Sequence, residues 1–333
     1  MRHYSSLKRD RFWLYSRIGM KTYDLAVAWN WEFDADFVSG IRRECESRGL
    51  TMVEVQPADL PTMLEHLRSN TVSIGVFYDR ASDADEAFNP LVDLTRHGPT
   101  RTINPHDRVR HAIDKATMHL EFITNGLHVP YTTILSPFNQ KKEIELVSTQ
   151  LDKLGKPFVI KPANTTGGGT GVVLDAMTVN DIFEARQQHK DDKYLLQEKI
   201  DPKNLDGKRG WFRVYYAFGE IIPCWWDDLT HMYSELTSEE EARFGLSGLR
   251  DVVSKIENIC RLDFFSSEIA QTNGGTFVVV DYVNEICDMR LQSRYHNGAP
   301  DAVVQRIQQL VAGDVERHAR RHGAITAAVE VKV

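Results

Sequence analysis

The stretch FVIKPANTTGGGTGVVL, residues 158–174, is the most informative part of this chain. An apolar run ends on Lys161 and Pro162, a loop of threonines and glycines follows, and apolar β-branched residues resume at Val172. The pattern predicts a strand, a glycine-rich loop and a second strand. Such a loop can fold over phosphates, because glycine lets backbone N–H groups approach phosphate oxygens closely. A plain hairpin turn is the alternative, although it would need fewer glycines and no adjoining lysine.

Two other phosphate-binding motifs do not fit this loop. A P-loop ends in Gly-Lys-Ser/Thr and opens a helix, whereas Gly171 is followed here by Val-Val-Leu. The dinucleotide-binding fingerprint also needs a helix after its glycines. The loop therefore fits a mobile lid between two strands better than a cradle at a helix N-terminus.

The composition is that of an ordinary globular protein. The chain has 333 residues, enough for two or three packed units, with 42% hydrophobic and 26% charged residues. The net charge of −7 makes a broad nucleic-acid surface unexpected, so an anionic ligand would need local cations. The scattered cysteines argue against a zinc knuckle or a disulfide framework and favour a reducing cytoplasm; they are Cys45, Cys224, Cys260 and Cys287. No apolar run is long enough to span a membrane.

Strands and helices alternate along the first third of the chain, which predicts an α/β fold class with a small parallel sheet. Residues 1–22 are interpreted as a basic leader, either disordered or a surface arm. A signal peptide does not fit there, because Arg11 and Arg17 interrupt its apolar region. Residues 23–104 are predicted to form an N-terminal parallel α/β domain.

A helix and two hairpins are predicted further along. Apolar residues at helical spacing predict one helix between Pro105 and Gly126, with Lys115 off the apolar stripe and free to reach a ligand. The stripe consists of Val109, Ile113, Ala116, Leu120 and Ile123. Residues 141–155 predict another helix. Hairpins are predicted around Gly219–Glu220 and at Asn273-Gly274-Gly275.

Charged and amide side chains recur near the predicted strands that surround the glycine-rich loop. In chain order they are Lys115, Lys161, Gln197 and Glu198 in LLQEKI, Arg213 in WFRVYY, Glu268, Asp281 and Asn284. Each of them alone has an ordinary structural explanation, such as a solvated lysine or a buried ion pair. As an ordered set they resemble the ATP-grasp superfamily over roughly residues 104–285. The resemblance is strongest to the glutathione-synthetase and ribosomal-modification ligase type.

This resemblance implies a fold with α+β character, in which two subdomains clamp a nucleotide. Residues 105–195 would be the central subdomain with the glycine lid, and residues 196–333 the C-terminal subdomain with a metal site and the terminal helix. The implied ligands are ATP and Mg²⁺, with Mn²⁺ as an alternative metal. The implied roles are phosphate binding by Lys115 and Lys161, a lid formed by Gly167, Gly168 and Gly169, an adenine hinge at Gln197, Glu198 and Ile200, charge neutralisation during transfer by Lys161 and Arg213, and metal binding by Glu268, Asp281 and Asn284.

The metal-binding segment departs from the pattern of the superfamily. The usual Glu-x-Asn places both side chains on one face of a strand, whereas Asp281-Tyr-Val-Asn284 would place them on opposite faces. A β-bulge near Tyr282–Val283 would bring Glu268, Asp281 and Asn284 together again. We therefore predict that bulge.

A second departure concerns the substrate. The usual Pro-Gly after the asparagine is replaced by EICDMRLQSR, in which Arg290 either holds an anionic substrate or forms a surface salt bridge. The adjacent Trp225 and Trp226 either line a substrate pocket or pack in the core.

The sequence thus predicts an ATP-dependent, ADP-forming ligase. It would join a small-molecule or peptide carboxylate to an amine through an acyl phosphate. The alternatives are an ATP-grasp kinase acting on a small hydroxyl acceptor and an ATP-binding module without turnover. The expected partners are the acid and the amine, with neither nucleic acid nor membrane, and homo-oligomerisation is left open.

Overall fold

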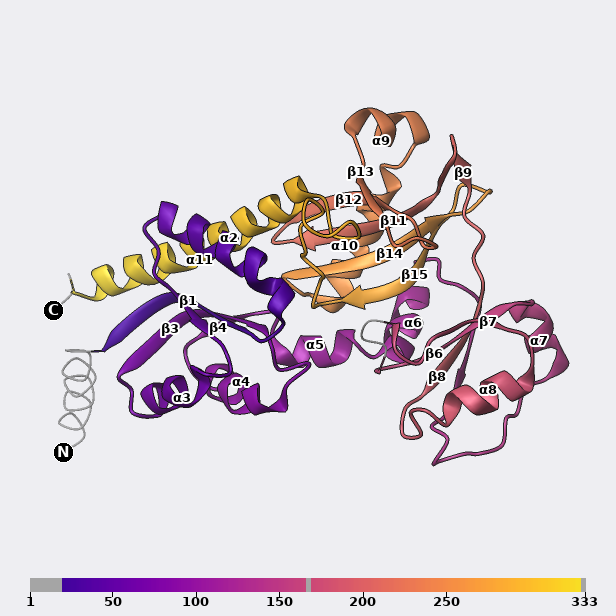
Figure 1. The fold of residues 1–333 in the computed structure, drawn as a ribbon, viewed down its shortest axis with the longest axis horizontal. Coiled ribbons are helices and arrows are strands. Elements are labelled where there is room, and N and C mark those ends of the chain that lie inside the picture. The colour runs from indigo at the N-terminus through magenta and orange to yellow at the C-terminus, as the bar shows by residue number, and fades with distance from the viewer. Residues whose placement is uncertain (1–19, 166–168, 331–333) are drawn as a thin grey trace, which may run out of the picture. The chain divides into compact units, whose positions relative to one another are not determined.

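The computed structural model describes residues 20–165 and 169–330, with side chains described up to residue 321 (Figure 1). The described chain divides into two compact units. The first comprises the chain up to Pro105, Asp288–Tyr295 and the residues from Asp301 onward, and the second comprises His106–Cys287 and His296–Pro300. Residues 1–19 of the predicted leader lie outside the described residues.

The first unit is built on a parallel sheet, as the sequence predicted, with the strand order β2-β1-β3-β4 (Figure 1). Helices cover both of its faces, so the strands read as apolar runs. The strands are β1 (Lys21–Trp29), β2 (Met52–Val55), β3 (Val72–Arg80) and β4 (Arg101–Ile103). The helices are α2 (Ala35–Ser47), α3 (Leu60–Arg68), α4 (Asn89–Arg96) and α11 (Asp301–Glu330), with short 3-10 turns η1 (Glu32–Asp34) and η2 (Glu86–Phe88).

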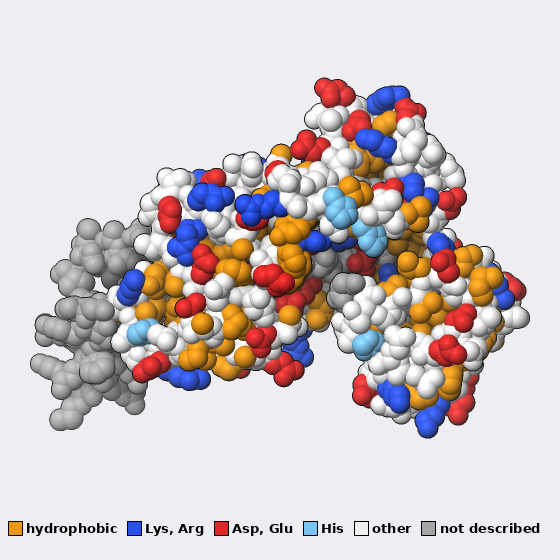
Figure 2. All heavy atoms as spheres, viewed as in Figure 1, with side chains coloured by type: hydrophobic (Ala, Val, Ile, Leu, Met, Phe, Trp, Pro, Cys, Tyr) orange, Lys and Arg blue, Asp and Glu red, His pale blue; other side chains and the backbone are white. Residues whose placement is uncertain are grey.

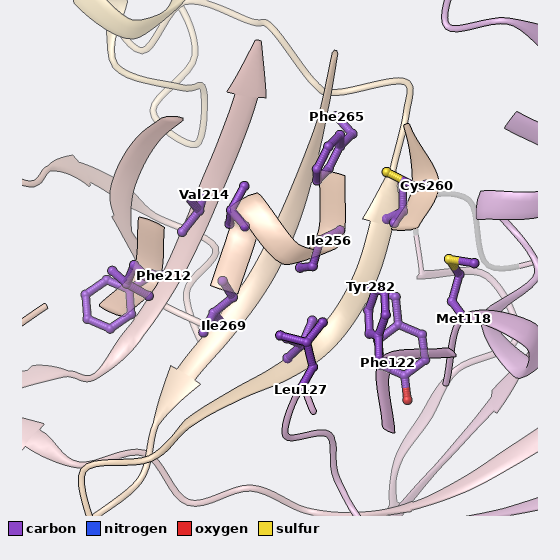
Figure 3. Packing of buried hydrophobic residues seen from close by; sticks show 14 of the residues in the cluster. Met118, Phe122, Leu127, Phe212, Val214, Ile256, Cys260, Phe265, Ile269 and Tyr282 are labelled. Carbon is purple, nitrogen blue, oxygen red and sulfur yellow. The ribbon is translucent and has the colours of Figure 1, made fainter. Parts of the chain in front are cut away.

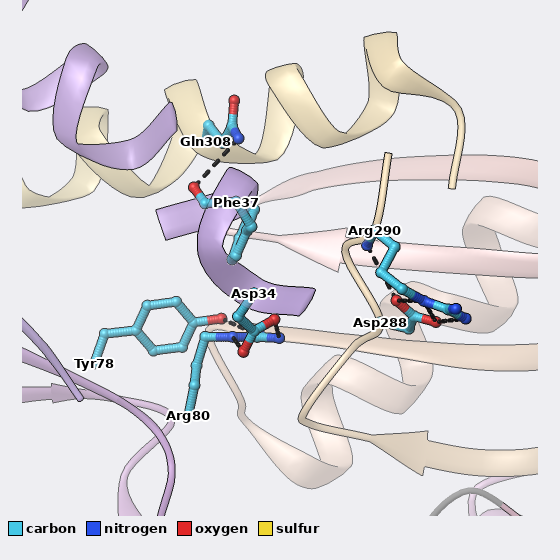
Figure 4. A network of polar contacts seen from close by, with 7 residues as sticks. All are labelled: Asp34, Phe37, Tyr78, Arg80, Asp288, Arg290 and Gln308. Atoms are coloured by element: carbon cyan, nitrogen blue, oxygen red, sulfur yellow. Dashed lines mark hydrogen bonds and ion pairs between the residues drawn. The ribbon is translucent and has the colours of Figure 1, made fainter. Parts of the chain in front are cut away.

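The last helix belongs to the first unit, which corrects its assignment to a subdomain of residues 196–333. It packs against α2, where the Gln308 amide Nε2 donates to the backbone oxygen of Phe37 at 3.2 Å (Figure 4). A Cβ atom at Gly40 would lie 2.0 Å from that nitrogen, so this close contact requires glycine. The apolar stripe of a helix predicts that one helix face is buried, but it does not predict which sheet that face packs against.

A buried ion pair fixes the loop that follows β1. The Arg80 guanidinium, 2% exposed, donates to both carboxylate oxygens of Asp34 at 2.8 and 2.6 Å (Figure 4). It also donates to the Tyr78 hydroxyl at 3.2 Å. Because removing one partner would leave a buried charge, this pair holds the loop firmly to the end of β3.

The second unit contains two antiparallel sheets joined in one continuous stretch of chain (Figure 1). The first sheet has the order β5-β8-β6-β7, and its elements are β5 (Thr132–Leu135), β6 (Phe158–Pro162), β7 (Val173–Ala176) and β8 (Tyr194–Glu198), with α5 (His106–Ala112), α6 (Lys115–Thr124), α7 (Ser148–Leu154) and α8 (Val179–Arg186). The second sheet has the order β13-β12-β11-β14-β15, and its elements are β11 (Trp211–Ala217), β12 (Glu220–Trp226), β13 (Tyr233–Glu235), β14 (Phe264–Gln271) and β15 (Phe277–Asn284), with α9 (Ser238–Phe244), α10 (Gly248–Cys260) and the short ribbon β9 (Asn204–Leu205)–β10 (Lys208–Arg209). Both predicted hairpins are present, as β11–β12 and β14–β15.

The second sheet packs one face into the main core of the unit, and its other face carries charged side chains among apolar ones. Alternate residues such as Phe212, Val214 and Ile269 pack with α10 and α6 in the main core cluster (Figure 3). The residues between them, such as Trp211, Arg213 and Glu268, point to the other face, because side chains alternate along a strand. The polar face is therefore available for chemistry.

Two predicted helices differ in the structure. The helix expected between Pro105 and Gly126 is broken into α5 and α6 by Asp114, whose carboxylate accepts from the Thr117 N–H at 3.0 Å as an N-cap. The break changes the buried face, so Leu120 and Ile123 are 57% and 51% exposed and Lys115 is only 8% exposed. The helix expected over residues 141–155 is limited to α7.

The surface agrees with the weak net charge. Lys and Arg side chains are interspersed with Asp and Glu over the viewed face (Figure 2). Within the described chain, every helix is too short or too polar to cross a membrane.

Candidate functional site

Charged side chains form a row across the polar face of the second sheet. In the strand register, Glu268 on β14 lies opposite Arg213 on β11 and opposite Asp281 on β15. Lys115 at the start of α6 and Lys161 at the end of β6 reach Asp281 from the first sheet and its helices. We call Lys115, Lys161, Asp281, Glu268 and Arg213 the charged row.

The bulge predicted in β15 is present. The pairing shifts by one residue between Glu268–Asp281 and Ser266–Asn284, which places the extra residue at Tyr282–Val283. Ser266 and Glu268 share one face of β14, so Asn284 joins both carboxylates on that face. A second shift, between Ile269–Val279 and Glu268–Asp281, places another extra residue at Val280 and was not predicted.

At the two irregularities, backbone carbonyl groups of β15 accept hydrogen bonds from side chains. The Lys161 Nζ donates to the backbone oxygen of Val280 at 2.9 Å. The Ser267 hydroxyl donates to the backbone oxygen of Tyr282. Because Lys161 comes from the first sheet, its bond to Val280 ties the two halves of the second unit together at the charged row.

Ion pairs hold the lysine end of the row. The Asp281 carboxylate lies 3.6 Å from the Lys115 Nζ and 3.9 Å from the Lys161 Nζ. Burial lowers the pKa of Lys161 to about 8, with the charge of Lys115 adding to the effect and Asp281 opposing it. Burial disfavours the Asp281 carboxylate, but Lys115, Lys161 and Arg213 outweigh it and lower its pKa. Asp281 is therefore ionised at neutral pH.

The other end of the row is an arginine–glutamate pair. Arg213 donates through its terminal nitrogen to Glu268, which also accepts from the Trp211 indole N–H at 3.3 Å. Burial opposes the charge of Arg213, yet Glu268 outweighs burial, so the pKa of Arg213 is raised. The guanidinium lies 5.0 Å from the ring centre of Trp226, within the range of a cation–π contact.

The charges of the row nearly cancel. Three cations face two carboxylates, which leaves about one positive charge for an anionic ligand. The described residues contain no group of three or more His, Cys, Asp and Glu side chains placed to hold a metal. Two carboxylates and the Asn284 amide on one face nevertheless provide hard oxygen donors, and Mg²⁺ completes its shell with water and substrate oxygens. The donor set therefore fits Mg²⁺ once the cations move to a ligand.

A buried hydrogen-bonded network, which sequence reasoning missed, lies behind the lysines. The Tyr282 hydroxyl lies 2.6 Å from the His119 Nδ1 and accepts from the Gln197 amide at 2.8 Å. Burial and the nearby charge of Lys161 lower the pKa of His119 to about 4, so the ring is neutral and its Nδ1 accepts a hydrogen bond from the Tyr282 hydroxyl. The Lys161 Nζ lies 5.4 Å from the ring centre of Tyr282. Tyr282 follows Asp281 on β15 and points to the core face of the sheet, where it is fully buried.

The predicted adenine hinge lies at the end of β8. The side chain of Gln197 is buried, with a second bond to the Thr132 hydroxyl at 3.0 Å, so it has a structural role. Glu198 pairs with Tyr131 through both its backbone N–H, at 2.9 Å, and its carboxylate, at 2.7 Å. Ile200 follows the strand. Adenine binding at this segment remains a prediction.

The base of the glycine-rich loop is anchored by Asp192, another residue that sequence reasoning missed. Its carboxylate accepts from the backbone N–H groups of Asn164, at 2.9 Å, and Thr165, at 3.1 Å. It also accepts from both of their side chains at 2.9 Å. Gly169 has φ +80°. Gly167 and Gly168 lie outside the described residues, so the lid itself remains a prediction.

Arg290 belongs to the first unit. It pairs with Asp288 at 2.6 Å (Figure 4) and lies within 5.9 Å of the ring centres of Trp31, Phe33 and Tyr295. Its role in substrate binding remains a prediction.

Comparisons with known proteins identify the fold. No family model matches the sequence, and no curated protein does either. The structure is similar to an ATP-grasp RimK-domain protein from Sphaerobacter thermophilus, with 19% identity, a TM-score of 0.60 and coverage of 87% of this chain and 99% of that one. It is also similar to the ATP-grasp ligase PsnB in complex with a precursor peptide (14% identity, TM-score 0.58, 89% and 98% covered) and to D-alanine–D-alanine ligase from Bacillus anthracis (12%, 0.59, 91% and 99%). The chain has the ATP-grasp fold, which confirms the resemblance at the level of the fold.

Proposed function

We propose that this protein is an ATP-dependent, ADP-forming ligase that joins a carboxylic acid to an amine. The observation that carries the proposal is the charged row. Buried lysines, two carboxylates, an amide and a partly buried arginine meet at one sheet face, and they include the cations that phosphoryl transfer needs. The solved structures of similar fold include ligases for peptides and for D-alanine, which supports the reaction class.

The lysine end of the row suits the nucleotide. Lys115 and Lys161 would leave Asp281 and bind the ATP phosphates, with the lid formed by Gly167, Gly168 and Gly169 above them. Glu198 and Ile200 would place the adenine through their backbone groups, while Gln197 supports the strand. Mg²⁺ or Mn²⁺, held by Glu268, Asp281 and Asn284, would neutralise phosphate charge.

The arginine end suits the transfer. A carboxylate oxygen of the acid attacks the γ-phosphorus in line, the bond to the ADP oxygen breaks, and an acyl phosphate forms. Arg213 and Lys161 stabilise the negative charge on the transferred group, because fixed cations in a buried site need no reorganisation. The amine then attacks the acyl carbon, inorganic phosphate leaves, and the amine nitrogen loses a proton.

An assay with a surrogate amine tests the reaction. The protein is incubated with ATP, Mg²⁺, pooled carboxylic acids and hydroxylamine, and ADP, AMP and hydroxamates are followed by mass spectrometry. We expect ADP together with an acid-dependent hydroxamate. ADP with a stable phosphorylated product and no hydroxamate would instead indicate a kinase, and AMP would exclude the mechanism.

An arginine variant links the activity to the row. Arg213→Met should abolish hydroxamate formation. The control is Arg250→Met, because Arg250 pairs with Glu241 at 2.8 Å outside the row. Equal losses in the two variants would contradict the role of Arg213.

The four cysteines are all buried free thiols, which supports the cytoplasm as the compartment in which the protein acts.

A further inference from the structure

The strand alternation separates the adjacent tryptophans. Trp225, 4% exposed, packs in the core with its ring 4.9 Å from that of Phe212. Trp226 points to the opposite face, which carries the charged row. Only Trp226 can therefore contact a substrate held at the row.

Trp226 is part of an ordered ring stack. The ring of His231 lies parallel to it, with centres 5.4 Å apart and an angle of 12°, and the Tyr233 ring lies 4.5 Å away. The Arg213 guanidinium also contacts the Trp226 ring. Trp226 is half-buried and His231 is exposed, so the stack runs from the reacting centre to the surface. We call Trp226 and His231 the aromatic shelf.

The turn between β12 and β13 fixes the shelf. The Asp227 carboxylate accepts from the N–H groups of Leu229 and Thr230 at 2.9 and 2.8 Å. The Asp227 carbonyl accepts from the His231 N–H at 2.8 Å. His231 adopts φ +58°, a left-handed conformation that non-glycine residues rarely adopt. Such a turn holds the imidazole over the indole before any ligand arrives.

The strand register places the aromatic shelf at the Arg213 end of the charged row, away from the lysines. Arg213, Glu268 and Asp281 lie opposite one another on β11, β14 and β15, and the β12 partner of Arg213 is Cys224. Trp226, two residues beyond Cys224 on the same face of β12, pairs with Tyr233 on the outer strand β13. The lysines lie at the Asp281 end. In an in-line transfer the attacking acid lies on the side of the γ-phosphorus opposite ADP. With the phosphates at the lysines, the acid lies beyond Arg213, at the shelf.

We propose that the aromatic shelf binds the non-reacting part of the acid, and that this substrate is a carboxylic acid carrying a planar aromatic ring. The assignment rests on the proposed function for the direction of transfer. A stacked ring pair contributes about 0.5–1.5 kcal/mol beyond the burial of its area. A small aliphatic acid gains none of this energy.

Ligand binding tests the shelf without turnover. Saturation-transfer NMR and competition titrations are run with Mg²⁺ and a non-hydrolysable ATP analogue, using phenylacetate and indole-3-acetate against acetate and succinate. We expect the ring acids to bind better to the wild-type protein. Trp226→Leu and His231→Ala should each weaken them about twofold to tenfold, and Trp226→Phe should retain most of the affinity. Phe183→Leu is the control, because Phe183 is 41% exposed on α8.

The outcomes separate the shelf from the proposed function. Better binding of acetate or succinate than of the ring acids, or equal ring-acid affinity in the His231→Ala variant and the wild type, overturns the shelf. Ring acids that bind through the shelf while no acid elicits ADP support the shelf and overturn the ligase. Where turnover occurs, the shelf changes the ratio of kcat/KM between ring and aliphatic acids. A Trp226 that only positions Arg213 would lower kcat equally for all acids, which also overturns the proposal.

Discussion

Replacing Lys115 with methionine should change the binding of two ligands in opposite directions. The variant should bind MgATP more weakly, because one phosphate contact is lost, and should bind Mg²⁺ alone more tightly. The Lys115 ammonium lies 3.6 Å from the Asp281 carboxylate, and its charge opposes a metal ion there. Two unit charges at this distance interact with about 5 kcal/mol at an effective dielectric constant of about 20. Asp281 is 32% exposed, and screening by water reduces the measurable effect to about 1–2 kcal/mol, or about 5- to 30-fold in affinity.

Isothermal titration calorimetry measures both effects on one protein sample. MgCl₂ is titrated into nucleotide-free protein, and then Mg²⁺ with a non-hydrolysable ATP analogue is titrated. Lys141→Met is the matched control, because Lys141 pairs with Glu145 at 2.6 Å on the surface of the same unit. An unchanged Mg²⁺ affinity in the Lys115→Met variant would refute the idea that the row is neutralised by exchangeable ion pairs.

Three other perturbations test separate parts of the site. Arg213→Lys should lower kcat by about 10²- to 10³-fold while leaving the Kd of the ATP analogue within a few fold, since lysine cannot reproduce the planar fork; a large loss of nucleotide binding would contradict this. Tyr282→Phe leaves the buried His119 and Gln197 without a shared partner and should cost about 1–3 kcal/mol of unfolding free energy, measured by urea denaturation with Tyr295→Phe as the control. An unchanged midpoint would show that the network adds no stability. Because the pKa of Lys161 is about 8 in the ligand-free protein, its ammonium is present below pH 8 and lost above it. Nucleotide binding above pH 8 should therefore take up a proton and weaken as the pH rises, and calorimetry in buffers of different ionisation enthalpy would detect that uptake or show its absence.

The sequence predicted the fold and much of the row because both depend on local spacing. The strand ending on Lys161 and the hairpin around Glu268 follow from apolar runs and turn residues. The bulge at Tyr282–Val283 was predictable because Asp281 and Asn284 are spaced by an odd number of residues, and it is present.

The remaining features depend on contacts between segments far apart in the chain. The backbone oxygen of Val280, at the second irregularity, accepts a hydrogen bond from Lys161, which lies 119 residues earlier in the chain. Asp192 anchors a loop from the turn before β8, and a lone aspartate in a polar turn carries no such signal. The prediction that Leu120 belongs to a buried apolar stripe was wrong. Asp114 caps a new helix, α6, and the buried face of α6 does not continue that of α5.

The first unit is discontinuous in sequence, and this affects how the protein can be made. The residues up to Pro105 leave the ribosome long before the helix from Asp301, whose Gln308 lies against Gly40. The stretch His106–Cys287, by contrast, is complete before that helix is translated. During synthesis the second unit can therefore fold first, while one face of the N-terminal sheet still lacks the helix that covers it.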